Sequence, residues 1–238
     1  MNGVIFYTNH RNLTFCKAIA YSFVVFPISM VALVFVLLSI PLLFKWIVIG
    51  NFNELQSKGL MAVGTWNSFK WMLCNSVVSG ISTLTLPLLN EFWLTSMFWR
   101  LMGAKIGKNT LIDPNVLICE ADLLEIGDNC RIEEETTLLC HKFNDGGLKL
   151  DRIVVPSSCS LQARSIVFPG SEICDEHVTM LPLTCLNPGE KVFKGHWQGC
   201  PTEKVNFGEK EMELMTGAMR GSTMFTQRES ISKYDDIV

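Results

Sequence analysis

Aliphatic residues recur at nearly every sixth position through the central part of the chain. The recurring positions are Ile106, Ile112, Ile118, Ile126, Ile132, Leu138, Val155, Leu161, Val167 and Ile173. Amphipathic helices and alternating strands have shorter periods, whereas a three-sided coil of short parallel strands turns one side chain inward every six residues. The pattern therefore predicts an all-β left-handed parallel β-helix over residues 103–205.

Small or modest residues stand four places after these aliphatic positions, where such a coil turns a corner. They are Thr110, Val116, Cys130, Thr136, Cys159, Ser165 and Ser171. Asp122 and His177 fit the corner pattern less well. The alternative is a sandwich of short strands, but its turns come at longer and less even spacing. We favour the coil because the repeat is periodic.

The first part of the chain is apolar and predicts α-helices that are transmembrane or interfacial. Between residues 18 and 50 the only charged side chain is Lys45, and about 20 apolar residues are enough to cross a bilayer. A second apolar stretch, about 71–102, contains Glu91, which is costly in lipid. This stretch is either a second span or an interfacial helix. Residues 1–102 are thus predicted to anchor the chain in the membrane.

The positions of basic residues favour an integral membrane protein whose β-helix domain faces the cytoplasm. If there are two spans, basic residues lie before the first and after the second, as the positive-inside tendency requires. These residues are Arg11, Lys17, Arg100, Lys105 and Lys108. Lys45 acts against this orientation.

The cysteine pattern and the net charge limit the partners of the chain. Its nine cysteines include no paired short-spaced motif of the zinc-binding kind, so we expect reduced thiols and no metal. Reduced thiols agree with a cytosolic location. The net charge is −3 and there is no basic stripe, which argues against a nucleic-acid partner.

The repeat breaks between Leu138 and Val155, and this insertion must bulge out of the coil as a loop. His141 stands at its base, where a rigid scaffold can hold an imidazole that acts as a general base. The alternative is an ordinary surface histidine. Asp145 could orient the imidazole or bind a cationic substrate, or could only form a turn with the two glycines that follow it. His141 and Asp145 are the candidate catalytic residues.

The sequence Ile106-Gly107-Lys108-Asn109-Thr110 and the later repeats resemble the hexapeptide-repeat acyltransferases. The loop that carries His141 falls where that superfamily has its catalytic histidine. The closer resemblance, carried by Trp99-Arg100-Leu101-Met102-Gly103-Ala104-Lys105-Ile106-Gly107, is to the membrane-associated C-terminal condensing modules of ε-poly-lysine synthetase-like non-ribosomal peptide synthetases. These modules also join apolar helices directly to a coil. The resemblance covers about residues 71–205.

This resemblance implies transfer of an acyl or aminoacyl group from a thioester to an amine or hydroxyl acceptor. The donor would be a thioester of coenzyme A or of carrier-protein phosphopantetheine, and no metal would take part. Gly199 and Pro201 match a Gly-x-Pro element that lies beside the donor's pantetheine arm in related enzymes, and Trp197 stands just before it. Superfamily sites form between coils, so a single coil implies a homotrimer.

Other functions stay open at this point. The coil could be a non-catalytic trimeric scaffold or a subunit of a membrane complex. The chain could also be the terminal fragment of a longer synthetase. A γ-type carbonic anhydrase uses the same coil, but it needs three histidines around zinc, and His141 has no such companions at matching positions.

The repeat is lost from Asn206 onward. Residues 207–219 interleave charged and apolar side chains, which predicts a short amphipathic helix that caps the coil. The polar residues after Gly221 are predicted to be disordered. Residues 206–238 thus form a third region.

Overall fold

The structure is a computed structural model, and its chain divides into two compact units, Met1–Glu203 and Lys204–Val238. The first unit contains apolar N-terminal helices followed by parallel sheets, in agreement with the coarse outline of the predicted fold. The capping helix and tail predicted after Asn206 lie outside the described residues, and so does Asp145. The structure describes residues 2–56, 59–144 and 146–206.

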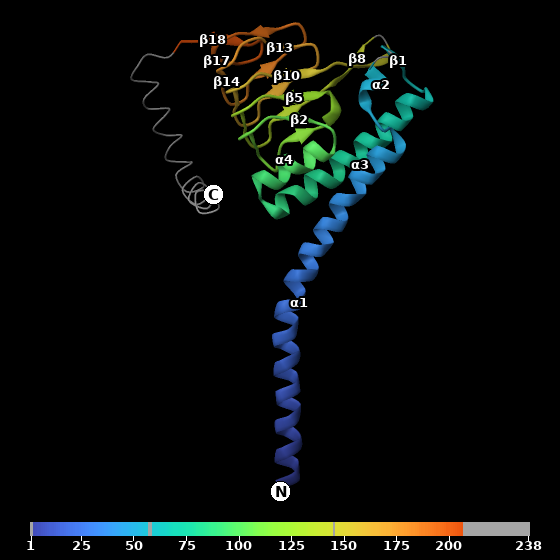
Figure 1. Cartoon of the computed structure of the whole chain (residues 1–238), viewed down its shortest axis with the longest axis vertical. Coiled ribbons are helices and arrows are strands. Elements are labelled where there is room, and N and C mark those ends of the chain that lie inside the picture. The colour runs from blue at the N-terminus through green and yellow to red at the C-terminus, as the bar shows by residue number, and fades with distance from the viewer. Residues whose placement is uncertain (1, 57–58, 145, 207–238) are drawn as a thin grey trace. The chain divides into compact units, whose positions relative to one another are not determined.

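In the described residues, four α-helices precede the parallel sheets. α1 packs against α3, and α4 lies against the first strands of the sheets (Figure 1). α3 ends at Leu89 and is capped by Asn90, which adopts a left-handed conformation with φ 47°, and α4 begins at Phe92. The apolar stretch 71–102 is therefore two helices separated by a turn. The helices are α1 (Asn2–Val48), α2 (Phe52–Gln56), α3 (Trp66–Leu89) and α4 (Phe92–Leu101).

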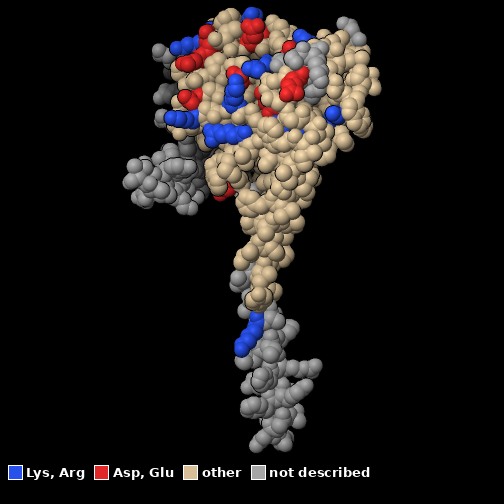
Figure 2. Space-filling view, turned by 45° about the vertical axis from the view of Figure 1, so that its right-hand side comes forward, with Lys and Arg blue, Asp and Glu red and all other residues tan. Residues whose placement is uncertain are grey.

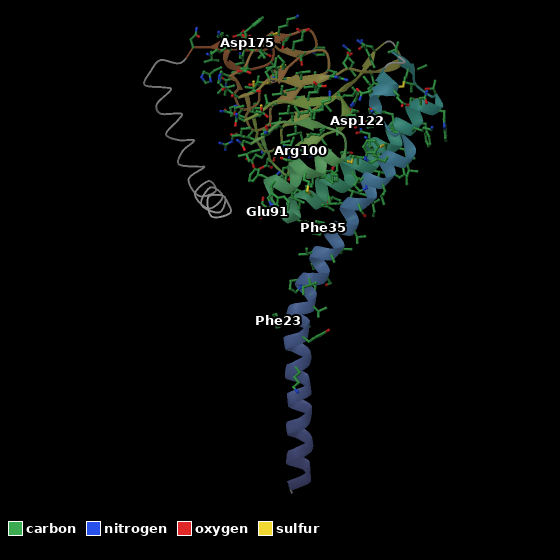
Figure 3. The ribbon with its side chains drawn as sticks, in the orientation of Figure 1. Phe23, Phe35, Glu91, Arg100, Asp122 and Asp175 are labelled. Atoms are coloured by element: carbon green, nitrogen blue, oxygen red, sulfur yellow. The ribbon has the colours of Figure 1, made fainter. Side chains whose placement is uncertain are left out.

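Two helical segments, Tyr21–Glu54 and Trp66–Leu88, are long and apolar enough to cross a membrane. Figure 2 shows charged side chains over the strands, whereas the described surface of the long helix is largely uncharged. Exposed aromatic side chains such as Phe23 and Phe35 project from α1 (Figure 3). Length, composition and exposed apolar surface are all compatible with an environment of lipid.

After the helices, the chain forms three faces, each built of parallel strands. Successive strands belong to the first, the second and the third face in turn. β2, β5 and β10 pair on the first face, which continues next to β10 with β13 and β16. The second face has the order β3-β6-β11-β14-β17, and the third has the order β4-β7-β12-β15. Each circuit of three strands thus stacks in parallel on the previous circuit (Figure 1). We call this stack the coil.

The strands of the coil are short, as a six-residue repeat with corners requires. In the first two circuits they are β2 (Lys105–Ile106), β3 (Leu111–Ile112), β4 (Leu117–Ile118), β5 (Leu124–Ile126), β6 (Arg131–Ile132) and β7 (Thr137–Leu138). The next two circuits contain β10 (Ile153–Val155), β11 (Ser160–Leu161), β12 (Ile166–Val167), β13 (Glu172–Ile173), β14 (Val178–Met180) and β15 (Cys185–Leu186). The last strands are β16 (Lys191–Val192), β17 (Gly195–Gln198) and β18 (Glu203–Val205).

The aliphatic positions of the six-residue pattern form the core of the coil. All of them are buried except Ile106 in the first strand, which is half-buried. Ile112, Ile132 and Leu161 stack in register on one face. Burying each such side chain contributes about 1.5–3 kcal/mol. The small residues predicted to stand at the corners are buried as well.

The repeat continues beyond the last aliphatic position that the sequence pattern identified. The period lengthens by one residue after Ile173, so the next inward residue is Met180, seven positions further on. Leu186 and Val192 then restore the six-residue spacing and are fully buried. The slip hid these later positions from the sequence pattern.

The long insertion between β7 and β10 is an antiparallel hairpin of β8 (His141–Asn144) and β9 (Gly147–Leu150). β1 (Met61–Ala62), just before α3, pairs with β9 and extends the hairpin into a three-stranded sheet. Leu60 packs so closely on Gly147 that a Cβ there would overlap it. The predicted loop is therefore an ordered sheet that connects the coil to the start of α3.

Candidate functional site

His141 is the first residue of β8, at the base of the inserted hairpin. Its side chain is 15% exposed. The imidazole packs edge-to-face on Trp71 of α3, with ring centroids 4.8 Å apart, and Phe143 lies 5.9 Å from the same indole. Trp71 is buried, whereas Phe143 is exposed. An N-terminal helix therefore forms one wall beside the candidate base.

Glu120 faces the imidazole from the coil side and is fully buried. Its Oε1 lies 2.9 Å from His141 Nδ1, an ion-pair distance without hydrogen-bond alignment. The same oxygen accepts a hydrogen bond from the Trp71 indole N–H at 2.8 Å, and Oε2 accepts one from the backbone N–H of Cys140 at 3.2 Å. These two donors fix the carboxylate. Because the carboxylate occupies the Nδ1 side, Nε2 is the nitrogen left to meet a substrate.

Glu120 was not among the candidates from the sequence, although a signal was present. Ile118 and Ile126 are eight residues apart, two more than the period. The lengthened segment contains a 3₁₀ turn, η1 (Ala121–Leu123), immediately after Glu120. An acidic residue beside a lengthened repeat was thus the available indication of a second functional position.

Asp122, in the middle of η1, makes a second buried contact with the N-terminal helices. Its Oδ1 lies 2.7 Å from Lys45 Nζ, and its Oδ2 accepts a hydrogen bond from the backbone N–H of Phe52 at 2.8 Å. Figure 3 shows Asp122 where the strands meet the helices. The short segment that carries Glu120 is therefore held by both α1 and α3.

Three potential metal donors meet at the site. A ligand atom from each of Cys119, Glu120 and His141 lies within 4.8 Å of the other two. Desolvation by burial raises the pKa of the Cys119 thiol well above its usual range. A metal ion bound here would hold this thiol as its thiolate. The three donors belong to the same cluster as the Glu120–His141 contact.

The thiols differ in expected reactivity, because burial also raises the pKa of Cys140. Cys174 and Cys200 are exposed. A neutral buried thiol is a poor nucleophile, so we expect a maleimide to label Cys174 and Cys200 in the folded protein while Cys119 and Cys140 react only after unfolding. Peptide mass spectrometry measures this. Equal labelling of Cys119 and Cys174 in the native protein would contradict it.

The residues expected to contact the acyl donor lie on the last circuit of the coil. Trp197 is in β17, where its indole N–H donates to a backbone carbonyl at 2.6 Å. Gly199 accepts a backbone hydrogen bond, and Pro201 is exposed. In the part of the chain that the structure describes, no hydrogen bond, ion pair or ring contact joins these residues to His141. One chain alone therefore does not bring the two predicted groups into contact.

One curated protein is similar to this chain over much of its length. It is the delta-poly-L-ornithine synthetase of Acinetobacter baumannii, 29% identical over 164 residues. The match covers 67% of this chain but only 12% of the synthetase. No known protein-family model matches the chain. A synthetase that joins amino acids agrees with the resemblance to poly-amino-acid synthetase modules.

Several solved structures of acyltransferases are also similar to the chain. A hexapeptide-repeat acetyltransferase from Vibrio cholerae shares 12% identity at a TM-score of 0.47, covering 64% of this chain and 97% of the other. A maltose O-acetyltransferase from Clostridium difficile shares 12% identity at a TM-score of 0.44, covering 67% and 98%. An N-acyltransferase from Bacillus cereus, solved with coenzyme A, shares 16% identity at a TM-score of 0.33, covering 53% and 96%.

Proposed function

We propose that the chain is a membrane-anchored acyltransferase, or an amide-forming condensing domain, with His141 as its general base. It transfers an acyl or aminoacyl group from a pantetheine thioester to an amine or hydroxyl. The observation that carries the proposal is the buried Glu120 carboxylate at 2.9 Å from His141 Nδ1. A carboxylate in this position orients an imidazole and stabilises its protonated form, as a base requires.

The reaction then needs one proton acceptor and two positioned substrates. The acceptor's nitrogen or oxygen attacks the thioester carbonyl, and His141 Nε2 takes its proton. The new C–N or C–O bond forms, the C–S bond breaks, and the proton passes from the imidazole to the leaving thiolate. Positioning and proton removal account for most of the required acceleration. Asp145, which lies outside the described residues, stays our candidate contact for a cationic acceptor.

The coil is, in this proposal, the left-handed β-helix of the hexapeptide-repeat enzymes, and its active site forms between copies of the chain. The separation of Trp197, Gly199 and Pro201 from His141 supports this arrangement. The donor's pantetheine arm would lie along the last circuit of one copy and reach the His141 of another. A carrier-protein thioester and a coenzyme A thioester present the same arm.

A shared site predicts that the protein is a homotrimer. We expect a mass in detergent of three times the 26.8 kDa of one chain, after correction for bound detergent. Size-exclusion chromatography with multi-angle light scattering measures this mass. An active monomer would contradict the shared site.

The N-terminal helices, in this proposal, insert in the membrane and leave the coil in the cytoplasm. Lys45 argued against that orientation as a free positive charge, but it is buried and paired with Asp122. A paired lysine no longer counts as a loop charge that sets topology. The contact of Lys45 with Asp122 puts the C-terminal end of α1 on the coil's side of the membrane, so the basic residues that support a cytoplasmic coil are those after the helices, such as Lys105 and Lys108.

The direct test of the activity is acceptor-dependent release of free thiol from an acyl-coenzyme A. The full chain in lipid nanodiscs should release the thiol faster when an amine is added, and mass spectrometry should find the acylated amine. Screening acyl and aminoacyl thioesters with amine and hydroxyl acceptors identifies the substrates. A coil that binds these compounds without any turnover would instead be a scaffold.

Neutralising the orienting carboxylate should lower the rate without unfolding the protein. We expect Glu120→Gln to reduce kcat by at least about tenfold, because the amide neither stabilises the imidazolium nor fixes the same tautomer. The measurement is thiol release at saturating donor. Glu172→Gln, on the exposed face of β13, is the matched control and should retain the wild-type rate. Equal rates in both variants would rule out Glu120 as an orienting group.

A further inference from the structure

Lys45 is the only charged residue within the apolar stretch 18–50, and its side chain is completely buried. The ammonium lies 2.7 Å from Asp122 Oδ1 and 3.6 Å from the centroid of the Trp46 ring. The indole N–H of Trp46 in turn donates to the carbonyl of Leu101 at 3.1 Å. The ammonium is thus enclosed between α1 and the segment that carries Asp122.

A single tight turn joins Asp122, which the N-terminal helices hold in place, to Glu120 of the candidate site. Both of its carboxylate oxygens are used by the N-terminal helices, one by Lys45 and one by the N–H of Phe52. Within η1 the N–H of Leu123 donates to the carbonyl of Glu120 at 3.0 Å. Because Glu120 lies only two residues before Asp122 in this turn, the position of Asp122 limits where the Glu120 carboxylate can lie.

Gly103 closes the remaining space around the ion pair. A Cβ at this residue would overlap the carboxylate of Asp122 and approach Lys45 Nζ to 3.4 Å. Its φ of +107° is a backbone conformation that favours glycine. The backbone at the start of the coil therefore packs directly against the pair, which leaves the pair little freedom to change geometry.

Attachment of the helices alone does not account for this ion pair. α1 already packs against α3, and apolar side chains attach helices at least as well, since a buried ion pair is often no more stable than an apolar replacement. What a buried ion pair can add is a defined position for the groups joined to it. The groups joined to Asp122 lead directly to Glu120 and His141.

We propose that Lys45 and Asp122 are positioning residues through which α1 holds Glu120 against His141. The proposal rests on the proposed function, because it assigns the ion pair a role in the acyl transfer made by His141. The N-terminal helices then help to position the active site. Trp71 of α3 donates a hydrogen bond to the Glu120 carboxylate and so fixes it from a second helix.

The test is a double-mutant cycle on the full chain in nanodiscs, with kcat for acyl transfer as the measured quantity. One arm is Lys45→Met with Asp122→Leu, which removes both charges and leaves no unpaired ion. The other arm is Glu120→Gln. We expect each arm to lower kcat at least tenfold with KM for the acyl donor little changed. The combined variant should be little slower than the slower arm, because both changes act through the same carboxylate.

Two outcomes overturn the proposal. The first is an uncharged pair that retains the wild-type kcat. The second is a combined loss equal to the product of the two separate losses, since this means that the pair acts independently of Glu120. If the uncharged pair does not fold, Lys45→Met with Asp122→Asn takes its place in the cycle, because it also leaves no unpaired ion and keeps the shape of the Asp122 side chain. The matched control is Lys191→Met with Glu172→Leu, which removes an exposed ion pair whose charged atoms are also 2.7 Å apart. This control should keep the wild-type kcat. Combined with Glu120→Gln, it should lower kcat no further than Glu120→Gln alone.

The ¹⁵N chemical shifts of the His141 imidazole separate failure of this proposal from failure of the proposed function. If wild-type protein shows no His141-dependent turnover, the proposed function fails, and the shifts then judge the positioning role alone. We expect the uncharged pair and Glu120→Gln to change the balance of imidazole tautomers in the same direction. Unchanged shifts in the uncharged pair overturn the positioning role.

Discussion

Replacing His141 with alanine is expected to lower kcat for acyl transfer by about 10²–10⁴-fold. The alanine variant keeps both substrate-binding surfaces but loses the imidazole that takes the acceptor's proton. KM for the acyl donor should change little, because Trp197, Gly199 and Pro201 lie on a different circuit of the coil. The measurement is release of free thiol from the acyl donor identified by screening, followed at saturating acceptor.

The matched control for this substitution is His177→Asn. His177 is an exposed histidine of the coil with φ 60°, a backbone conformation that asparagine tolerates. It should keep the wild-type rate. Equal turnover by wild type and His141→Ala, with both proteins folded, would remove His141 from the mechanism.

Replacing Lys45 alone with methionine is expected to destabilise the protein by about 3–5 kcal/mol. The substitution leaves the Asp122 carboxylate buried without its cation, and the desolvation of that charge is then uncompensated. A loss of this size lowers Tm by roughly 10 °C in a chain of this length. Thermal unfolding in detergent, followed by the circular dichroism of the sheets, measures the change.

Two further variants interpret that result. Lys191→Met removes a lysine from an exposed ion pair and should leave Tm nearly unchanged, because water solvates the remaining carboxylate. Adding Asp122→Leu to Lys45→Met should restore most of the lost stability, since no buried charge then remains. A Lys45→Met variant as stable as wild type would show that the ion pair does not form.

The coil could be predicted from the sequence because its stabilising contacts follow a short period along the chain. Each inward residue stacks on the residue one circuit away. Ile112, Ile132 and Leu161 are therefore both equivalent positions of the sequence repeat and neighbours in the structure. The insertion at His141 was visible as a break in that period. The position of the candidate base thus followed from local pattern alone.

The contacts that surround His141 could not be predicted in the same way. Lys45 and Asp122 are 77 residues apart, and Trp71 and Glu120 are 49 apart, with no repeat relating either pair. The sequence indicates only that one lysine interrupts an apolar helix and that the repeat lengthens by two residues after Ile118. Which helix meets which turn is set by tertiary packing of α1 and α3.

These long-range contacts change the meaning of the N-terminal helices. From composition they are anchors, and any apolar helices would serve. In the structure, Trp71 reaches the carboxylate of Glu120, just before η1, and Lys45 reaches that of Asp122, within η1. A coil cut free of the helices would lose both contacts. Because of this, we expect activity to require the full chain rather than residues 103–205 alone.

A structure of the full chain in nanodiscs, with a non-reactive thioether analogue of the acyl donor and an amine acceptor, tests the central claim most directly. The account predicts the acceptor nitrogen within about 2.6–3.2 Å of His141 Nε2, with Glu120 still at Nδ1. It is contradicted if the acceptor nitrogen faces another side chain, or if the imidazole points away from both substrates.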